Sequence, residues 1–160
     1  NLIAISKSSD NNDIFKSNMK LIEELEKDRK FCKHGLDHSL DVARIAYIKS
    51  LEDNLNISKE VIYAVGLLHD LGRSLQYKEG IPHHEGSVIL AKQILKDTLF
   101  NDDEKSLIIS GIENHRKSDD KNYFYKLIQD SDKLSRNCFS CKSYNECYWD
   151  SNKKNNFIKY

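Results

Sequence analysis

The sequence that decides the fold of this 160-residue chain is Gly66-Leu67-Leu68-His69-Asp70-Leu71-Gly72-Arg73, where a histidine and an aspartate follow an apolar run. Imidazole and carboxylate groups are side chains that hold divalent cations in proteins. Adjacent residues on a helix point about 100° apart, so His69 and Asp70 aim at one point only where the helix end is buried. The alternative is an ordinary helix end in which both side chains bond to nearby backbone, and the pair alone does not exclude it.

Further histidines and a late aspartate surround this pair in a definite order. All six histidines lie between positions 34 and 115. Outward from the central pair, the candidate ligands are His38, His83, His84, His115 and Asp132. The order of a histidine, a His-Asp pair, two more histidine positions and an aspartate resembles the HD-domain superfamily of metal-dependent phosphohydrolases. The resemblance covers about residues 31–136.

The resemblance implies one metal ion or two. The ligands implied for the first ion are His38, His69, Asp70 and Asp132. A second ion is implied at His83 and His115, with Asp70 bridging the two. The small residue Ser87 and the aliphatic-alanine step after it select His83, and a shift of one residue would select His84 instead. The alternative for His115 is an imidazole that interacts with the end of a helix dipole.

The composition favours a single all-α domain. Pro82 is the only proline and there are six glycines, so few residues interrupt helices. Apolar residues at helical spacing predict about six helices, near residues 13–30, 36–53, 58–68, 83–95, 101–115 and 123–136. A chain of this length can form one hydrophobic core. We expect one helical bundle over residues 1–160, with an arm at 1–11, a core at 31–136 and a cysteine-containing loop and polar tail at 137–160.

Polarity suggests the position of three further features. Glu23, Glu24 and Glu26 are expected on the solvated face of the first helix. Residues 74–82 contain a glycine and the proline, and are expected to form a loop, the best candidate for a lid. His34 lies four residues before the first predicted ligand and is interpreted either as substrate-binding or as a solvent-facing or merely pocket-lining residue.

The overall charge excludes some partners. The chain has 25 basic and 25 acidic side chains, a balance that gives no overall field to attract nucleic acid or an anionic membrane. No apolar run approaches the roughly 20 residues that span a bilayer, and the amino terminus has no secretory pattern. We expect a cytoplasmic protein whose partner is a small phosphorylated molecule, with no nucleic acid and no membrane among its partners. The sequence does not indicate an oligomeric state.

Four cysteines form a separate group of candidate ligands. Cys138, Cys141 and Cys147 follow a C-x2-C-x5-C pattern, and Cys32 lies about a hundred residues upstream. Disulfides are not expected without a secretory signal. If the first and last predicted ligands share a metal ion, their helices are neighbours and Cys32 comes near the other three thiols. The four then offer a site for zinc or an iron–sulfur cluster, and the alternative is a set of reduced, partly buried cysteines.

A hydrolytic metal centre is the predicted function. Nitrogen and carboxylate ligands without thiolate favour Mn²⁺, Fe²⁺, Co²⁺, Ni²⁺ or Zn²⁺ over Ca²⁺, and a bound metal activates water for attack on phosphate. The catalytic candidates are Asp70, with Arg73 and Lys133 to neutralise phosphate charge and Arg116 as a weaker third. The alternative for Arg73 is an ordinary surface arginine. The implied substrate is a phosphomonoester or phosphoanhydride, with a nucleotide as the first choice.

Two other functions stay open at this point. One is a regulatory module that binds metal and nucleotide without hydrolysis, and the other is oxidative di-iron chemistry on the same scaffold. The Gly-Tyr-Pro signature of the cyclic-dinucleotide branch of the superfamily is absent. Ser135-Arg136 replaces the Glu-Arg ending of the diadenosine-polyphosphate branch. The substrate therefore stays open.

Overall fold

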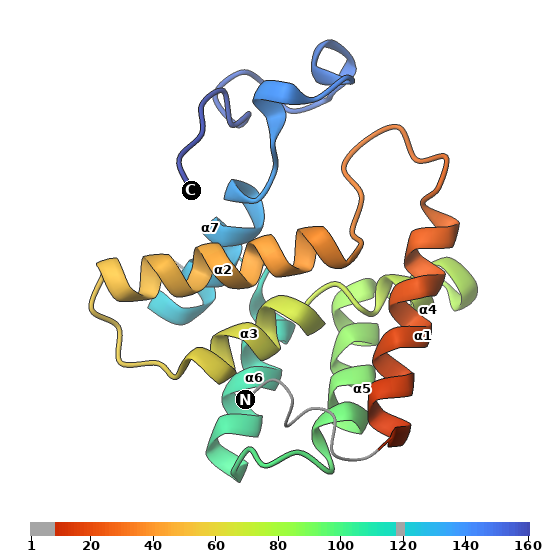
Figure 1. Ribbon diagram of the computed structural model, residues 1–160, viewed down its shortest axis with the longest axis vertical. Coiled ribbons are helices and arrows are strands. Elements are labelled where there is room, and N and C mark those ends of the chain that lie inside the picture. Colours follow the sequence, from red (N-terminus) through yellow and green to blue (C-terminus); the bar gives the residue numbers. More distant parts are fainter. Residues whose placement is uncertain (1–8, 118–120) are drawn as a thin grey trace.

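The structure, a computed structural model, describes residues 9–117 and 121–160, which form helices and no strand (Figure 1). The α-helices are α1 (Ser9–Leu25), α2 (Leu36–Glu52), α3 (Lys59–Leu68), α4 (Arg73–Glu79), α5 (His83–Leu95), α6 (Asp102–Asn114) and α7 (Tyr123–Leu134). Two single-turn 3₁₀ helices follow, η2 (Cys138–Ser140) and η3 (Tyr144–Glu146). The all-α prediction is confirmed. Of the expected arm, residues 1–8 lie outside the described residues and the remainder belongs to α1.

Each of the six expected helices is present, and local signals place several of their ends. Ser58 begins α3 as predicted, because its hydroxyl oxygen accepts a hydrogen bond from the backbone of the first turn. Asn101, rather than Asp102, begins α6: its side chain accepts from the backbone of Glu104, whose carboxylate accepts from the backbone of Asn101. Within the described ranges, no helix is both long and apolar enough to cross a membrane.

The segment expected as a loop and lid forms a helix instead. α4 occupies Arg73–Glu79 and packs against α1 and α5. Its Ser74 is buried, with the hydroxyl 2.7 Å from the side-chain oxygen of Asn18 on α1. Gly80 ends the helix in the left-handed conformation, with φ of 73°. Packing against neighbours stabilises so short a helix, and local polarity does not reveal it. The loop assignment was therefore wrong for most of residues 74–82.

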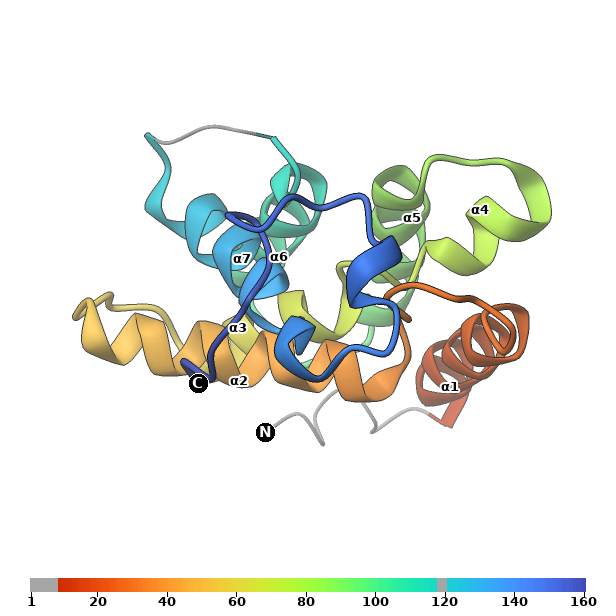
Figure 2. The same cartoon turned by 90° about the horizontal axis from the view of Figure 1, so that it is seen from above.

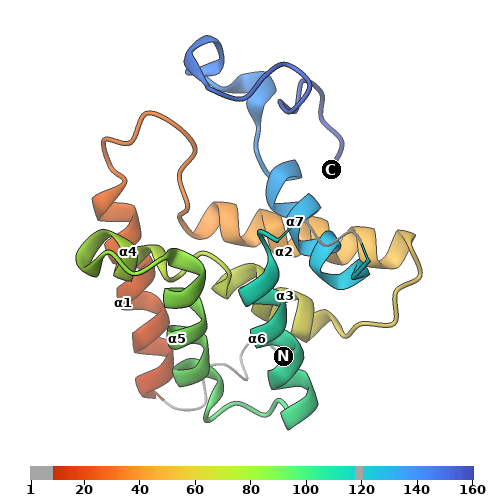
Figure 3. The same cartoon turned by 180° about the vertical axis from the view of Figure 1, so that it is seen from behind.

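α3 packs against α2, α5 and α6. It contacts α2 on one side and α6 on another, and α6 lies between α5 and α7 (Figures 1 and 3). The α3 residues with buried side chains or backbone are Val61, Ile62, Ala64, Val65, Gly66 and Leu68. At Gly66 an added Cβ would lie 2.7 Å from Cα of Ala43, so glycine allows α2 to approach closely. A helix buried on most sides thus carries the residues that follow it into the interior.

The turn after α3 is fixed against the start of α5. The backbone N–H of Gly72 donates to the Ser87 hydroxyl at 2.8 Å, and that hydroxyl donates to the carbonyl of His69 at 2.7 Å. A Cβ on Gly72 would lie 2.0 Å from the backbone nitrogen of Ser87 and 2.2 Å from the carbonyl oxygen of His83. Only a residue without a side chain permits this approach.

The C-terminal residues lie beside the loop between α1 and α2 (Figure 2). The Ser143 hydroxyl donates to the Lys30 carbonyl at 2.9 Å, and the Arg136 guanidinium donates to the Lys33 carbonyl at 2.8 Å. Lys30 also forms an ion pair with Glu146. Segments a hundred residues apart in sequence are thus neighbours in space.

The close approach at Gly72 predicts a large cost for a single methyl group. Gly72→Ala is expected to lower the free energy of unfolding by about 3 kcal/mol, because the clash is with backbone that cannot rotate away. Gly80→Ala is the control: its Cβ meets nothing within 4 Å, so only the left-handed backbone costs, about 1 kcal/mol. Urea denaturation followed by circular dichroism measures both. Equal losses in the two variants would contradict the close-packing explanation.

Candidate metal centre

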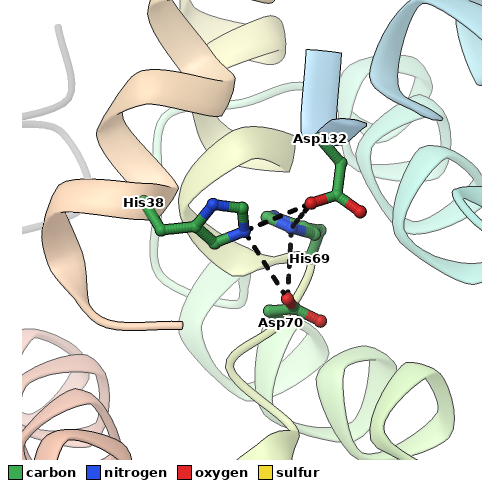
Figure 4. A group of neighbouring side chains, drawn as sticks. All are labelled: His38, His69, Asp70 and Asp132. Carbon is green, nitrogen blue, oxygen red and sulfur yellow. Dashed lines mark ion pairs between the residues drawn. The ribbon is translucent and has the colours of Figure 1, made fainter. Parts of the chain in front are cut away.

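Four side chains from separate parts of the chain converge in the interior (Figure 4). His38 lies in the first turn of α2, His69 ends α3, Asp70 follows it, and Asp132 lies in the last turn of α7. One nitrogen or oxygen from each lies within 4.8 Å of the others. Nε2 of His38 is 3.3 Å from Oδ1 of Asp132, and Nε2 of His69 is 3.5 Å from Oδ2 of Asp70.

A second group shares Asp70 with the first. It contains His83, the first residue of α5, and His115, which ends α6. Oδ2 of Asp70 is 3.7 Å from Nε2 of His38 in the first group, whereas Oδ1 is 3.5 Å from Nε2 of His83 in the second. The rings of His69 and His115 have centroids 5.2 Å apart. The two oxygens of one carboxylate therefore face two different sets of nitrogens.

The shared carboxylate is charged although it is only 3% exposed. Burial alone raises the pKa of Asp70, but the surrounding imidazoles and the Arg73 guanidinium outweigh it and hold the pKa well below the usual range. Nε of Arg73 lies 3.2 Å from Oδ1 of Asp70. The centre is thus a buried anion that depends on neighbouring positive charge.

At His38, burial is outweighed by hydrogen bonds with Asp132 and Asp70, which raise the pKa. Burial keeps His69, His83 and His115 neutral. It lowers the pKa of His69 to about 4 and the pKa of His83 to about 3, and it also lowers the pKa of His115. A neutral imidazole has one nitrogen that carries a proton and one with a free lone pair. The lone pair is what a metal ion needs.

Backbone carbonyls select which nitrogen of two histidines carries the proton. Nδ1 of His69 lies 2.8 Å from the carbonyl of Gly66, and Nδ1 of His115 lies 2.6 Å from the carbonyl of Ile112. A carbonyl only accepts, so each Nδ1 donates and each Nε2 keeps its lone pair. In both cases the histidine ends a helix and bonds to the carbonyl three residues earlier.

A serine selects the same tautomer for His38. The Ser135 hydroxyl donates its one proton to the carbonyl of Asp132 at 2.6 Å. Its oxygen lies 3.0 Å from Nδ1 of His38 and therefore accepts from that nitrogen. In the neutral ring, the lone pair of His38 is then on Nε2, the nitrogen nearest the carboxylates. Such hydrogen bonds to the outer nitrogen orient histidines in metal sites.

The unpaired atoms of the centre test whether these residues suit a cation. Among the described residues, the buried side-chain atoms without a hydrogen-bond partner are His69 Nε2, Asp70 Oδ1, Arg73 Nε and His83 Nε2. A buried polar atom left without a partner costs about 1–3 kcal/mol. Three of the four are electron-pair donors, which divalent cations held by the two groups would satisfy. The residues present therefore fit a metal ion.

The structure separates the remaining predicted residues into near and distant ones. His84, the competitor of His83, has a side chain 39% exposed that lies 3.9 Å from Glu85, and it belongs to neither group of candidate ligands. Lys133 and Arg116 are exposed and line a different cavity. Of the predicted catalytic cations, Arg73 is the one that contacts the centre.

One residue at the centre was missed from the sequence. The Arg136 guanidinium lies 3.4 Å from Oδ1 of Asp132 and 3.1 Å from Nε2 of His38. Its spacing of four residues from Asp132 is the signal that favours such a pair at a helix end. Arg136 therefore adds a second positive charge beside the carboxylates.

A buried pair behind the centre was also missed, and the position expected for Glu26 was wrong. Glu26 is 2% exposed rather than solvated. It accepts hydrogen bonds from the backbone and Nδ1 of His34, both at 2.7 Å, and from the Tyr77 hydroxyl. His34 is 4% exposed, with Nε2 3.9 Å from Oδ2 of Asp70, so it faces the centre and not solvent. The contact depends on how the α1–α2 loop folds back, which helical periodicity does not encode.

Replacement of the buried Glu26 is expected to lower the free energy of unfolding by an amount that depends on pH. Burial raises the pKa of Glu26, but hydrogen bonds from His34 and Tyr77 outweigh it and lower the pKa from 4.5 to about 2. Because the folded-state pKa is lowered, the stabilisation is complete above pH 4.5 and disappears as the pH falls toward 2. Glu26→Gln is expected to cost about 2 kcal/mol at pH 7, measured by urea denaturation.

The control for this variant is Glu24→Gln, at the end of α1 and two residues before Glu26. The Glu24 side chain is 62% exposed and lies 3.9 Å from Lys20, so its loss is expected to change stability by less than about 0.5 kcal/mol. The gap between wild type and Glu26→Gln should narrow on acidification below pH 4.5. A gap that stays constant down to pH 3 would show that Glu26 is not a charged buried acceptor.

The helical fold and the two buried groups of histidine and aspartate indicate a metal-binding helical domain. Comparison of the sequence with known proteins identifies the family. A family model described as the HD domain matches residues 35–137, so this chain belongs to the HD-domain family. The family expected from the order of the histidines is confirmed. No solved structure matched the chain.

Individual relatives differ in how much they share. A protein of Clostridium beijerinckii, named only as uncharacterized, is 49% identical over 142 residues, which are 89% of this chain and 90% of that protein. Ribonuclease Y of Mycoplasma mycoides is 30% identical over 110 residues, or 69% of this chain. Ribonuclease Y of Mycoplasma capricolum is similar to the same extent. The chain spans only 24% and 20% of these two ribonucleases.

Proposed function

We propose that this protein is a metal-dependent phosphohydrolase that acts on a phosphomonoester or phosphoanhydride, with a nucleotide as substrate. The observation that carries the proposal is the buried carboxylate of Asp70, whose two oxygens face two groups of imidazole nitrogens. Membership of the HD-domain family supports it. When bound, divalent cations supply a hydroxide nucleophile at neutral pH and stabilise phosphate oxygens.

The ligands follow from the two groups. We assign His38, His69, Asp70 and Asp132 to the first ion, and Asp70, His83 and His115 to the second. All donors are imidazole nitrogen or carboxylate oxygen, which suits Mn²⁺, Fe²⁺, Co²⁺, Ni²⁺ or Zn²⁺. His83 is preferred over His84 because His83 is buried against Asp70.

Two arginines are assigned to the charge of the phosphate. Arg73 and Arg136 each contact a carboxylate of the centre, at 3.2 and 3.4 Å, and each guanidinium has further N–H groups that can donate to phosphate. Lys133 and Arg116 border another cavity, so we assign them at most a contribution to the electrostatic potential around the centre.

The cavity beside His38 supports a nucleotide as the substrate. Its volume is about 530 Å³, within the range of small-molecule sites. Aromatic residues Phe31, Tyr144 and Trp149 line it together with Arg136. Aromatic rings stack on nucleobases, and a base held there would direct its phosphate toward His38.

A second candidate is hydrolysis of the phosphodiester bonds of RNA. The similarity to ribonuclease Y proteins favours it, although the chain spans a quarter or less of their length. The equal numbers of basic and acidic residues give no general attraction for RNA. It is therefore placed second.

A substrate panel tests the proposed reaction. Metal-loaded protein is incubated with nucleoside mono-, di- and triphosphates, dinucleoside polyphosphates and a short oligoribonucleotide, and released phosphate and cleaved products are measured. Asp132→Asn is expected to reduce turnover at least about 100-fold, because it removes a charged donor from the centre. Asp130→Asn is the control, since Asp130 lies on the same helix but pairs with Lys126 at 3.4 Å.

The outcomes of the panel separate the candidates. Release of phosphate from mononucleotides or anhydrides supports the proposal, whereas cleavage of the oligoribonucleotide alone favours the second candidate. Nucleotide binding without turnover would instead indicate a regulatory module. Equal activity in the Asp132 and Asp130 variants would refute the assignment of the centre.

The neighbouring histidines of α5 test the second ion. His83→Gln is expected to lose about one equivalent of bound metal relative to wild type, since it removes one of three donors. His84→Gln is expected to keep both equivalents, because its side chain is 39% exposed and belongs to neither group of candidate ligands. Elemental analysis of dialysed protein measures both. Loss of metal in the His84 variant alone would reverse the assignment.

A further inference from the structure

The four cysteines of the chain border the cavity beside His38, so a metal centre held by them would occupy part of the space assigned above to a nucleobase. Two separate segments supply them: Cys32 comes from the loop between α1 and α2, and the C-terminal segment supplies Cys138, Cys141 and Cys147. All four are free thiols. The exposure of their side chains ranges from buried at Cys138 to exposed at Cys141.

A period of three residues directs the C-terminal thiols to the cavity. The residues of segment 138–147 that line it are Cys138, Cys141, Tyr144 and Cys147, each three residues after the last. In a 3₁₀ helix, residues three apart lie on the same face. Both single turns have this geometry, and the backbone N–H of Cys141 donates to the carbonyl of Cys138 at 3.1 Å. The local backbone thus turns the three cysteines toward the cavity, whereas the residues between them, apart from Tyr144, do not line it.

Contacts on either side of Cys32 hold its loop against this segment. The carbonyls of Lys30 and Lys33 accept from Ser143 and Arg136, at 2.9 and 2.8 Å. The Lys30 ammonium pairs with Glu146. Cys32 lies between these two lysines, so the approach of the fourth thiol to the other three is fixed by contacts that do not involve sulfur.

The C-terminal segment has almost no apolar core of its own. In residues 137–160, the buried side chains are those of Cys138 and Ser143. Large apolar side chains there, such as Phe139, Tyr148 and Phe157, are exposed. Segments too small to bury a core commonly depend on disulfides or a bound metal for their structure.

The surroundings of Cys32 disfavour a free thiolate. Burial raises the pKa of the Cys32 thiol, and the three other cysteines raise it further, against the opposing effect of Arg136. Three or four thiolates together would need a cation between them.

We propose that Cys32, Cys138, Cys141 and Cys147 bind a soft metal centre that fastens the C-terminal segment to the loop between α1 and α2. The shared chemistry is four thiolates around either one Zn²⁺ or an iron–sulfur cluster. The two groups of ligand atoms gathered within 4.8 Å contain no cysteine. One zinc ion with Zn–S bonds of about 2.3 Å would therefore draw the sulfurs to about 3.8 Å from each other, whereas a cluster holds them farther apart.

Metal content under anaerobic purification tests the proposal. Zinc, iron and acid-labile sulfide are measured with the visible absorption spectrum in wild type, Cys141→Ser and Asp70→Asn. Cys141→Ser is expected to lose about one zinc, or about four irons with their sulfide and charge-transfer absorption. Asp70→Asn is expected to keep that pool and to lose metal from the histidine–aspartate centre. The exposed neighbour Lys142→Ser is the control and should match wild type.

The zinc and iron–sulfur outcomes distinguish the two forms of the proposal. Unchanged zinc, iron and sulfide in both Cys141→Ser and Cys147→Ser would overturn it. Metal content does not depend on turnover, so failure of the proposed hydrolase and failure of this site are separate results.

Thiol reactivity of the unaltered protein gives a second measurement that needs no variant. Cys141 is exposed, so as a free thiol it would react at once with a disulfide reagent. In a metal centre, all four thiols are expected to resist until a mercurial or chelator is added, and their reaction should release metal in step. Immediate reaction of Cys141 without metal release would overturn the proposal.

Discussion

The buried negative charge of Asp70 is the constraint on which this structure depends. An ionised carboxylate that is 3% exposed is costly unless other charges and donors surround it. α3, itself buried on most sides, carries Asp70 inward, and the hydrogen bonds between Gly72, Ser87 and the His69 carbonyl fix the turn that aims it. Packing of the hydrophobic core and these hydrogen bonds thus position the charge of Asp70 without any bound ligand.

The groups around that charge are arranged to leave electron pairs free. Burial keeps His69 and His83 neutral at pH 7, with pKa values of about 4 and about 3. Hydrogen bonds at Nδ1 of His69 and His115 then turn the lone pairs at Nε2 inward. Neutral imidazoles carry no net positive charge, and one arginine contacts each of the two carboxylates, Arg73 at Asp70 and Arg136 at Asp132. The cluster therefore has an excess of electron-pair donors, which is the property of a cation site and not of a buried ion-pair network.

The parts of this centre that the sequence predicts are those encoded locally. Apolar spacing indicates the helices, Ser58 marks a helix start, and the order of the histidines indicates the family. Glu26 was misplaced because its partners, His34 and Tyr77, reach it only through a loop and a second helix. α4 was missed for the same reason, since packing against α1 and α5 stabilises it. Periodicity reports which face of a helix is apolar, but not which polar side chain a distant segment covers.

The end of α7 connects the two proposed metal sites. Ser135 bonds to Nδ1 of His38, and Arg136 contacts both His38 and Asp132. The backbone N–H of Cys138 then donates to the carbonyl of Arg136 at 2.9 Å, so the first thiol of the C-terminal segment follows directly. Whatever orders that segment also restrains Arg136 and, through it, the carboxylate of Asp132. Because coupling between two sites is reciprocal, a metal at the cysteines would change the metal affinity of the histidine–aspartate centre by the same factor as a metal at that centre changes the affinity of the cysteines.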